Sequence, residues 1–263
     1  MTSLNFFTGK SVMITGAASG LGRELARQLS PYAERLILLD LNQDGLSETA
    51  DICRAKGSYI ATYKADLLSD NPLAEVIEKE ECPDVIVANA GVGGVNPARF
   101  FDEGIDARIM GINYFGVVKT VSPYLKKMCE RGSGHIVGIS SLASIRGLPG
   151  ACSYSASKAA LNNFLESLRL DVAPYGVKVI TVLPGFLETP MANHNEFEMP
   201  FKVTVERSAQ HVLKAIIKNK KRYAFPWIMG FLSLFNKFMP VFIYDKILPL
   251  VSGQDKDMKP KIF

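Results

Sequence analysis

The segment Ser11-Val-Met-Ile-Thr15 runs directly into Gly16-Ala-Ala-Ser-Gly20-Leu-Gly22, and the order of these residues decides the fold. The apolar half is typical of a buried strand, and a helical pattern over Leu21–Ser30 follows at once. Glycine lets the backbone turn sharply, and a helix N-terminus presents N–H donors and a positive dipole end to a pyrophosphate. We therefore predict a dinucleotide diphosphate site made by Gly16, Ser19, Gly20, Leu21 and Gly22. A tight strand–helix turn without a ligand is the alternative.

Further along the chain, short apolar runs alternate with longer helical patterns. The runs are rich in Val and Ile and mostly lack polar alternation, which is typical of strands buried on both faces of a parallel sheet. The predicted strands are Ser11–Thr15, Arg35–Asp40, Tyr59–Ala65, Asp84–Ala88, Gly134–Ile139 and Val177–Leu183. The predicted helices are Leu21–Ser30, Gln43–Lys56, Pro72–Glu81, Asp102–Arg131, Ser153–Pro174 and Val205–Asn219. This order predicts an α/β fold, a doubly wound, Rossmann-like parallel sheet.

The chain is long enough for one large α/β unit, and we expect 1–263 to form a single domain. Within it, 186–205 is predicted to be a substrate lid segment and 222–263 an apolar C-terminal extension. The formal charge of +4 is small and spread along most of the chain, so nucleic acid is not an expected partner. The four cysteines form no Cys-x-x-Cys pair and no histidine cluster accompanies them, so no metal site is expected.

An acidic residue, Asp40, closes the second predicted strand, about twenty residues beyond the glycines, where a carboxylate can bind the adenosine ribose hydroxyls. A carboxylate would also repel the 2′-phosphate of NADP. The next residues, Leu41 and Asn42, carry no positive charge, and neither does Ser19. We therefore predict NAD as the cofactor, with NADP less favoured. A strand-end or helix-capping aspartate is the alternative interpretation of Asp40.

Tyr154 and Lys158 lie four residues apart near the start of a predicted helix, so they share one helix face. A free tyrosine has a pKa of about 10, too high for a base at neutral pH, and a nearby ammonium group favours the phenolate. Tyr-x-x-x-Lys alone is a weak pattern. The ends of the predicted strands strengthen it, because ligands of α/β sheets bind beyond the carboxyl ends of strands. Residues at that rim include Asn89-Ala90-Gly91, Ser141, Pro184-Gly185 and, shortly after, Thr189.

Taken together, these motifs resemble the short-chain dehydrogenase/reductase family over roughly residues 8 to 190. They occur in the family's order: Thr15-Gly-x-x-x-Gly20-x-Gly22, Asp66, Asn89-Ala-Gly91, Asn113, Ser141, Tyr154-x-x-x-Lys158 and Pro184-Gly185. The usual Asn-Asn-Ala-Gly reads Ala88-Asn89-Ala90-Gly91 here, a mild departure. The resemblance implies an oxidoreductase acting on CH–OH groups.

The resemblance also implies a role for each matching residue. Tyr154 would exchange the substrate proton, Lys158 would hold the nicotinamide ribose and lower the tyrosine pKa, and Ser141 would polarise the carbonyl. Ser140 competes for that last role, but the family places its serine thirteen residues before the tyrosine. Asn113 would hold a water that links Lys158 to solvent, or stabilise a helix irregularity. The remaining implied cofactor contacts are Asp66 and Leu67 to adenine, Asn89, Ala90, Gly91, Pro184 and Gly185 at the rim, and Leu187 and Thr189 to the carboxamide.

The substrate pocket is expected between the loop Leu142–Cys152 and the segment Phe186–Phe201. Its candidate lining is apolar, which suits a lipid-like, steroid-like or aromatic alcohol or ketone: Leu142, Leu148, Phe186, Met191, Phe197, Met199 and Phe201. The same side chains could instead pack a lid. Arg146 and His194 are weaker candidates for meeting an anionic group. Rival functions are an NADPH-dependent 3-oxoacyl or ketone reductase and a non-catalytic dinucleotide-binding protein.

The C-terminal stretch combines basic residues with an aromatic-rich pattern. Lys218, Lys220, Lys221 and Arg222 precede Trp227–Phe235. Such a combination is typical of a peripheral membrane helix, so 222–251 is a candidate membrane contact. A lid over the pocket or a subunit interface is the alternative. A homodimer or homotetramer is expected from the family resemblance, and the location is expected to be cytoplasmic, with or without peripheral attachment to a membrane.

Overall fold

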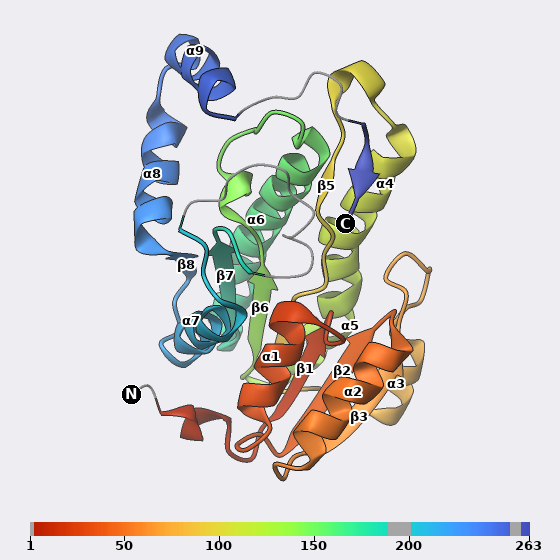
Figure 1. Ribbon diagram of the computed structural model, residues 1–263. Helices are drawn as coiled ribbons and strands as arrows, with labels where there is room; N and C mark the ends of the chain where they lie inside the picture. Colours follow the sequence, from red (N-terminus) through yellow and green to blue (C-terminus); the bar gives the residue numbers. More distant parts are fainter. Residues whose placement is uncertain (1–2, 189–200, 253–258) are drawn as a thin grey trace.

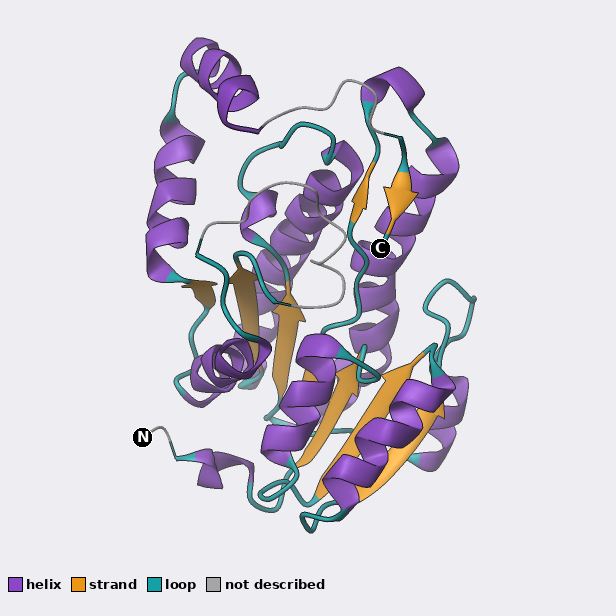
Figure 2. Cartoon of the chain, viewed as in Figure 1, coloured by secondary structure: helices purple, strands orange, loops and turns teal. Residues whose placement is uncertain are grey.

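The computed structural model describes residues 3–188, 201–252 and 259–263 and shows a central sheet with helices on both faces (Figure 1, Figure 2). Seven parallel strands lie in the order β3-β2-β1-β4-β6-β7-β8. They are β1 (Ser11–Thr15), β2 (Arg35–Asp40), β3 (Tyr59–Lys64), β4 (Val85–Ala88), β6 (His135–Ile139), β7 (Lys178–Pro184) and β8 (Arg222–Phe225). The strand order reverses between β1 and β4, where α/β sheets bind ligands. The predicted doubly wound Rossmann-like fold is confirmed.

Helices cover the two faces of this sheet in separate groups. They are α1 (Gly20–Leu29), α2 (Gln43–Arg54), α3 (Ala74–Lys79), α4 (Glu103–Met110), α5 (Gly116–Arg131), α6 (Cys152–Val172) and α7 (Val205–Ile217). The buried side chains of α1, α2 and α7 form one core, and those of α3, α5 and α6 form the other. In β1, Val12 and Ile14 point into the first core and Met13 into the second, because successive strand residues face opposite sides. All three are fully buried.

The helix predicted over Asp102–Arg131 is not continuous. A π-helical turn, η3 (Gly111–Phe115), separates α4 from α5, and the buried Asn113 lies within it. Such single π-turns insert one extra residue into a helix and occur frequently at functional sites. Hydrophobic periodicity cannot reveal this turn, because the inserted residue leaves the apolar pattern on either side intact.

The C-terminal part is more regular than the sequence indicates. After β8 come α8 (Trp227–Phe238) and α9 (Val241–Ser252), and β9 (Lys261–Ile262) pairs antiparallel with β5 (Gly94–Val95) (Figure 1). Gly93 and Phe263 also exchange two backbone hydrogen bonds, of 2.9 and 3.1 Å. The final residues therefore lie beside the segment that follows β4. Among the described residues, no helix is both long and apolar enough to cross a membrane.

Candidate active site

The backbone of the glycine-rich turn between β1 and α1 lies close to the segment that follows β4. Gly16 and Gly20 have φ angles of +69° and +50°, a region that side chains disfavour. A Cβ on Gly16 would lie 2.8 Å from Asn89 Nδ2 and 2.9 Å from the Cα of Ala90. The first turn of α1 contains no acidic residue. Its N-terminal N–H groups and dipole therefore suit an anionic diphosphate, so the turn fits the predicted group.

Gly22 is the tightest position of this turn. A Cβ there would lie 2.0 Å from the Gly16 carbonyl oxygen and 2.8 Å from Asn89 Nδ2. Overpacking of this kind destabilises, so Gly22→Ala should lower the free energy of unfolding by about 3 kcal/mol. Urea unfolding measures the change.

The matched control is Gly147→Ala, since a Cβ on Gly147 meets no heavy atom of the described residues within 4 Å. It should change the free energy of unfolding by less than about 0.5 kcal/mol. A Gly22→Ala protein as stable as the control would show that the turn can move to accept a methyl group.

Asp40 ends β2 beside the glycine turn. Its Oδ2 accepts a hydrogen bond from the Ala18 N–H at 3.0 Å, and its Oδ1 accepts one from the Asn42 N–H at 3.0 Å. The carboxylate thus orders the turn and remains half-buried at its mouth. Of the alternatives expected from the sequence, the structure shows a strand-end aspartate, while Asn42 and not Asp40 caps α2.

Sequence reasoning missed a cation in the same corner. Arg23, on the first turns of α1, donates from Nη2 to the Ala18 carbonyl at 2.5 Å and to Glu48 Oε2 at 2.8 Å. Its Nε donates to Thr49 Oγ1 at 3.0 Å. The sequence search looked for a basic residue at Ser19 and directly after Asp40. Arg23 directly follows Gly22 on α1, and its side chain turns back to the Ala18 carbonyl of the same turn.

Asn89 joins the ends of β4 and β1. Its Nδ2 donates to the carbonyl oxygens of Thr15 at 3.0 Å and Gly16 at 3.2 Å. The Thr15 hydroxyl in turn accepts from the N–H groups of Asn89 and Ala90, both at 3.1 Å. These bonds hold the Asn89–Gly91 segment against the glycine turn.

The predicted adenine contacts lie further out on the same rim. Asp66 is exposed, and its Oδ1 accepts a hydrogen bond from the Leu68 N–H at 2.9 Å. Leu67 is buried, and a Cβ added to Gly116 would lie 3.0 Å from its Cδ1. Leu67 therefore packs against α5, while Asp66 is accessible to a ligand.

Tyr154 and Lys158 lie on one face of α6, beyond the carboxyl end of β6. The Lys158 ammonium is buried, donates to the Ile139 carbonyl at 3.0 Å and lies 5.9 Å from the centre of the Tyr154 ring. Ser141 hydrogen-bonds with Tyr154 through its side chain. The Ser140 hydroxyl instead points to the Lys158 carbonyl, at 3.3 Å. Of the two serines, the geometry therefore places Ser141 beside the phenol.

The pKa of Tyr154 differs in direction from the sequence-based expectation. Burial raises the pKa of this phenol above its ordinary value of 10.0, and the hydrogen bond with Ser141 lowers it by less. Burial lowers the pKa of Lys158 from 10.5 to about 8. The expectation of a net lowering of the tyrosine pKa by Lys158 is not met in this structure, because loss of water around the phenol outweighs the opposing effects.

Asn113 contacts both the loop after β4 and helix α6. Its Oδ1 accepts from the Val92 N–H at 2.8 Å, and its Nδ2 donates to the Val92 carbonyl at 3.0 Å and to Ser157 Oγ at 3.1 Å. A Cβ on Gly91 would lie 3.0 Å from Asn113 Oδ1 and 3.3 Å from Lys158 Nζ. Gly91 therefore brings the amide and the ammonium group close to each other.

A second set of bonds, absent from the sequence prediction, holds the Ser141 loop. The Asn162 side chain donates to Ser144 Oγ at 2.6 Å, and the Ser144 hydroxyl donates to the Ser141 carbonyl. Asn162 is four residues after Lys158, so it extends the same face of α6 by one turn. That spacing is the sequence signal that could have identified it.

Only part of the segment that follows β7, on the side of the site away from the glycine turn, belongs to the described residues. Gly185 donates to the Phe225 carbonyl at 2.7 Å, which fixes the end of β7 against β8. Leu187 forms a parallel bridge with Val203. Thr189, the candidate anion contact His194, and the predicted lining residues Met191, Phe197 and Met199 lie outside the described residues.

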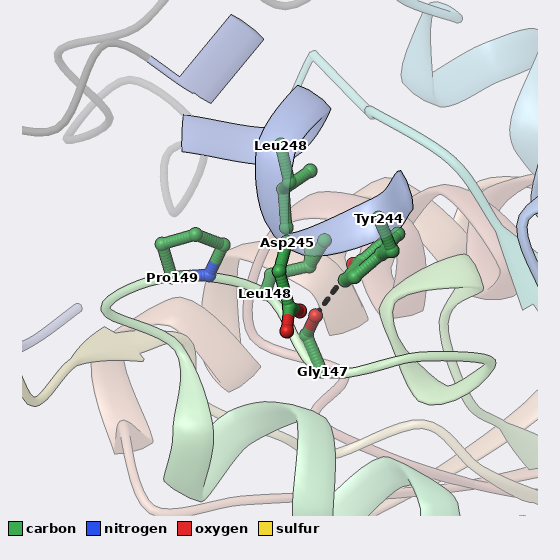
Figure 3. A pocket seen from close by; sticks show the side chains of 6 residues that line it. All are labelled: Gly147, Leu148, Pro149, Tyr244, Asp245 and Leu248. Atoms are coloured by element: carbon green, nitrogen blue, oxygen red, sulfur yellow. Dashed lines mark hydrogen bonds between the residues drawn. The ribbon is translucent and has the colours of Figure 1, made fainter. Parts of the chain in front are cut away.

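The loop after Ser141 faces α9 across an open cleft of about 380 Å³ (Figure 3). Gly147, Leu148 and Pro149 line it on one side, and Tyr244, Asp245 and Leu248 on the other. The Tyr244 hydroxyl donates to the Gly147 carbonyl at 2.7 Å (Figure 3). Arg146, a candidate anion ligand in the sequence, instead donates to the carbonyl oxygens at the end of α8.

Comparison with known proteins agrees with the family resemblance of the sequence motifs. The sequence pattern of the family described as "short chain dehydrogenase" matches residues 10–199. An uncharacterised oxidoreductase of Myxococcus xanthus is 34% identical over 240 residues, which cover 90% of this chain and 95% of the relative. Human epidermal retinol dehydrogenase 2 is 29% identical over 244 residues, which cover 89% of this chain and 79% of that protein.

Two solved structures show the same likeness. A short chain dehydrogenase/reductase of Burkholderia phymatum in complex with NAD has 26% identity and a TM-score of 0.77, covering 87% of this chain and 93% of its own. A short chain dehydrogenase of Burkholderia cenocepacia in complex with NADP has 24% identity and a TM-score of 0.80, covering 92% and 98%. The second likeness concerns the fold alone.

Proposed function

Because the chain belongs to the short-chain dehydrogenase/reductase family, and so is an oxidoreductase that acts on CH–OH groups with NAD(P), we propose that it uses NAD and an apolar alcohol/ketone pair. The observation that carries the proposal is the meeting of Ser141, Tyr154 and Lys158 beyond the end of β6, on the same rim as the glycine turn.

Proton exchange is the task of Tyr154. Its half-buried phenol hydrogen-bonds with Ser141, so a substrate oxygen held beside both hydroxyls can receive or give a proton. The raised pKa keeps the phenol protonated at neutral pH, ready to donate to a carbonyl. Bound nicotinamide supplies the hydride acceptor or donor. Lys158 places a positive charge beneath the tyrosine ring, and Asn113 and the Ile139 carbonyl orient the groups around it.

We place the cofactor along the rim from the glycine turn to Lys158. The N-terminus of α1 would hold the diphosphate, Asp40 the adenosine ribose, and Asp66 and Leu67 the adenine. Asn89, Ala90 and Gly91 would line the middle of the path. Leu187, Pro184 and Gly185 would close the nicotinamide end, together with Thr189.

The preference for NAD rests on Asp40, whose charge would repel a 2′-phosphate. The ratio of kcat/KM with NAD to kcat/KM with NADP should therefore fall by at least about tenfold in the Asp40→Asn protein, since like-charge contacts cost several kcal/mol. Asparagine keeps an acceptor for the Ala18 N–H. Steady-state kinetics with both cofactors measure the ratio.

Asp51→Asn is the control, because it removes the same charge from an exposed position on α2. It should leave the ratio unchanged. Wild-type protein that prefers NADP would instead support the rival NADPH-dependent reductase of 3-oxoacyl or ketone groups. Arg23 is the observation that favours this rival, because it lies against the Ala18 carbonyl beside Asp40.

An apolar substrate is supported by the residues around the loop after Ser141. Leu142 is buried beside the serine, and Leu148 and Leu248 line the neighbouring cleft. Apolar pockets with few polar groups suit lipid-like, steroid-like or aromatic compounds. Hydroxysteroids, long-chain alcohols and acyl derivatives should be compared by NAD reduction. Turnover confined to small polar alcohols would contradict this part of the proposal, and an absence of turnover with any compound would favour a non-catalytic dinucleotide-binding protein.

We also propose a homodimer or homotetramer assembled through α5 and α6. Phe115 on the π-turn and Leu170 on α6 expose large apolar side chains. Exposed apolar positions on neighbouring helices are typical of subunit interfaces. Sedimentation velocity should give the mass of an oligomer for the wild type and a lower mass for Leu170→Glu. An equal mass for the two proteins would exclude this interface.

A further inference from the structure

Helix α8 carries its large apolar side chains outward. Trp227, Phe231, Leu234, Phe235 and Phe238 recur at helical spacing and are exposed, with Trp227 at 77% and Phe238 at 76%. In a surface helix of a globular protein the apolar stripe normally faces the core. We call these five residues the α8 stripe, and its direction requires an explanation.

The inner side of α8 is already occupied by the protein itself. The helix contacts β8 and η4 (Leu142–Ser144) at the edge of the fold (Figure 1). A Cβ on Gly230 would lie 3.0 Å from Ala224 Cβ, so the helix approaches β8 closely. Rotating the helix to bury the α8 stripe would disrupt this packing.

Contacts from the loop that follows Ser141 hold α8 in the orientation that leaves the α8 stripe exposed. Arg146 donates to the carbonyl oxygens of Asn236 at 2.5 Å and Met239 at 2.7 Å, and its guanidinium lies 3.7 Å from the centre of the Tyr244 ring. These bonds satisfy the carbonyls at the end of α8. They join the turn between α8 and α9 to the loop that follows Ser141. The stripe continues onto α9 through Val241 and Phe242, which are also exposed.

The charge of this region is concentrated and positive. Between residues 218 and 248 there are six basic side chains and one acidic one, Asp245, a balance of +5. The whole chain carries +4, so the remainder carries −1, and the net positive charge is not spread along most of the chain as expected from the sequence. All six basic residues are exposed: Lys218, Lys220, Lys221, Arg222, Lys237 and Lys246.

We infer that the α8 stripe, with Val241 and Phe242 and the basic residues of 218–248, is a docking surface for an anionic lipid bilayer. Aromatic and aliphatic side chains of an amphipathic helix enter the headgroup boundary, and basic residues are attracted to anionic lipid. A second copy of the chain is disfavoured because the segment 218–248 has a net charge of +5, and symmetric pairing through α8 would bring two such segments together. At twelve residues, α8 lies on a bilayer, since a span takes about twenty residues.

Such docking would place the loop after Ser141 next to lipid. An apolar substrate could then pass from the bilayer to the site without crossing water, a consequence that rests on the proposed function. Docking itself needs neither substrate nor cofactor. Failure to bind lipid would leave the proposed function standing, and failure of the activity assays would leave the docking surface standing.

The test uses full-length protein and sucrose-loaded vesicles of phosphatidylcholine, with and without phosphatidylserine. Trp227 is the sole tryptophan of the chain, so its emission reports directly on the α8 stripe. We expect co-sedimentation and a blue shift of the emission with phosphatidylserine vesicles, both reduced by salt. No co-sedimentation and no shift would overturn the inference.

Two variants identify the face that binds. Phe231→Ser combined with Phe235→Ser should weaken partitioning by about a hundredfold, because two exposed aromatic side chains lose their burial in lipid. The control combines Tyr59→Ser with Phe101→Ser, which removes two exposed aromatic side chains away from α8 and should partition like the wild type. Equal partitioning of all three proteins would overturn the inference.

The charge is tested separately, so that a folding defect in the first variant cannot decide the outcome. Lys220→Gln combined with Lys221→Gln should reduce partitioning by about tenfold or more. Sedimentation velocity without vesicles, compared between the wild type and the Phe231/Phe235 variant, shows whether α8 takes part in self-association. A concentration-dependent blue shift that needs no lipid, lost in the Phe231/Phe235 variant, would overturn the inference in favour of a second copy of the chain.

Discussion

Replacing Tyr154 by Phe should lower kcat by about a thousandfold, within the range that a positioned acid–base group contributes. The substitution keeps the ring on α6 and removes only the hydroxyl that hydrogen-bonds with Ser141. The proton that must accompany hydride transfer then has no donor or acceptor at the substrate oxygen. Cofactor affinity should stay within about twofold, because the glycine turn and Asp40 are on other elements.

Single-turnover measurement of nicotinamide absorbance separates the chemical step from binding, and fluorescence titration gives the cofactor Kd. Tyr175→Phe is the matched control, since it removes an exposed hydroxyl at the end of the same helical segment and should leave kcat unchanged. A Tyr154→Phe protein that retained more than about a tenth of the wild-type kcat would assign the proton to another group.

The sheet could be read from the sequence because each strand is a local apolar run. The six predicted strands are confirmed with ends that agree to within a residue or two, as β1 and β2 illustrate. The seventh strand, β8 (Arg222–Phe225), was missed. It is four residues long and begins with a charged side chain, and α7 and about twenty further residues separate it from its partner β7 in the sequence. Nothing local distinguishes such a strand from a loop.

Local sequence also failed wherever a contact depends on two distant elements. Arg23 reaches the Asp40 corner because α1 packs beside α2, and Asn162 reaches the Ser141 loop through Ser144. The pKa of Tyr154 is a further example. The spacing of Tyr154 and Lys158 indicates a favourable charge, but the depth of burial, which decides the net direction, comes from the assembled fold.

The second large effect concerns Lys158, whose ammonium group is buried beneath the Tyr154 ring. Substitution by Met keeps the length of the side chain and removes the charge, so kcat should fall by about a hundredfold or more. The reason is electrostatic, because a cation near the phenol favours any negative charge that develops on the phenol oxygen. The free energy of unfolding should depend on pH differently in the wild type and in Lys158→Met. This difference tests whether the ammonium group is buried as the structure shows.

The folded-state pKa of Lys158, about 8, lies below the ordinary value of 10.5. Below pH 8 both the folded and the unfolded chain carry the proton, and the folded state bears the full cost of the buried charge. Between pH 8 and 10.5 the unfolded chain binds more protons, so the contribution of this group to the free energy of unfolding rises with pH. The difference between wild type and Lys158→Met should therefore grow in favour of the wild type by about 3 kcal/mol across this window.

Urea unfolding of both proteins at a series of pH values from 7 to about 10.5 measures that difference, and taking the difference removes the titration of groups common to both. The thiols of Cys53 and Cys82 are such groups, because burial raises their pKa. Lys126→Met, which removes an exposed ammonium group from α5, should follow the wild-type curve at every pH. Parallel curves for wild type and Lys158→Met would mean that water reaches Lys158 in solution. The electrostatic role of the lysine beside Tyr154 would then be much weaker than its burial implies, since water screens a charge that the protein interior does not.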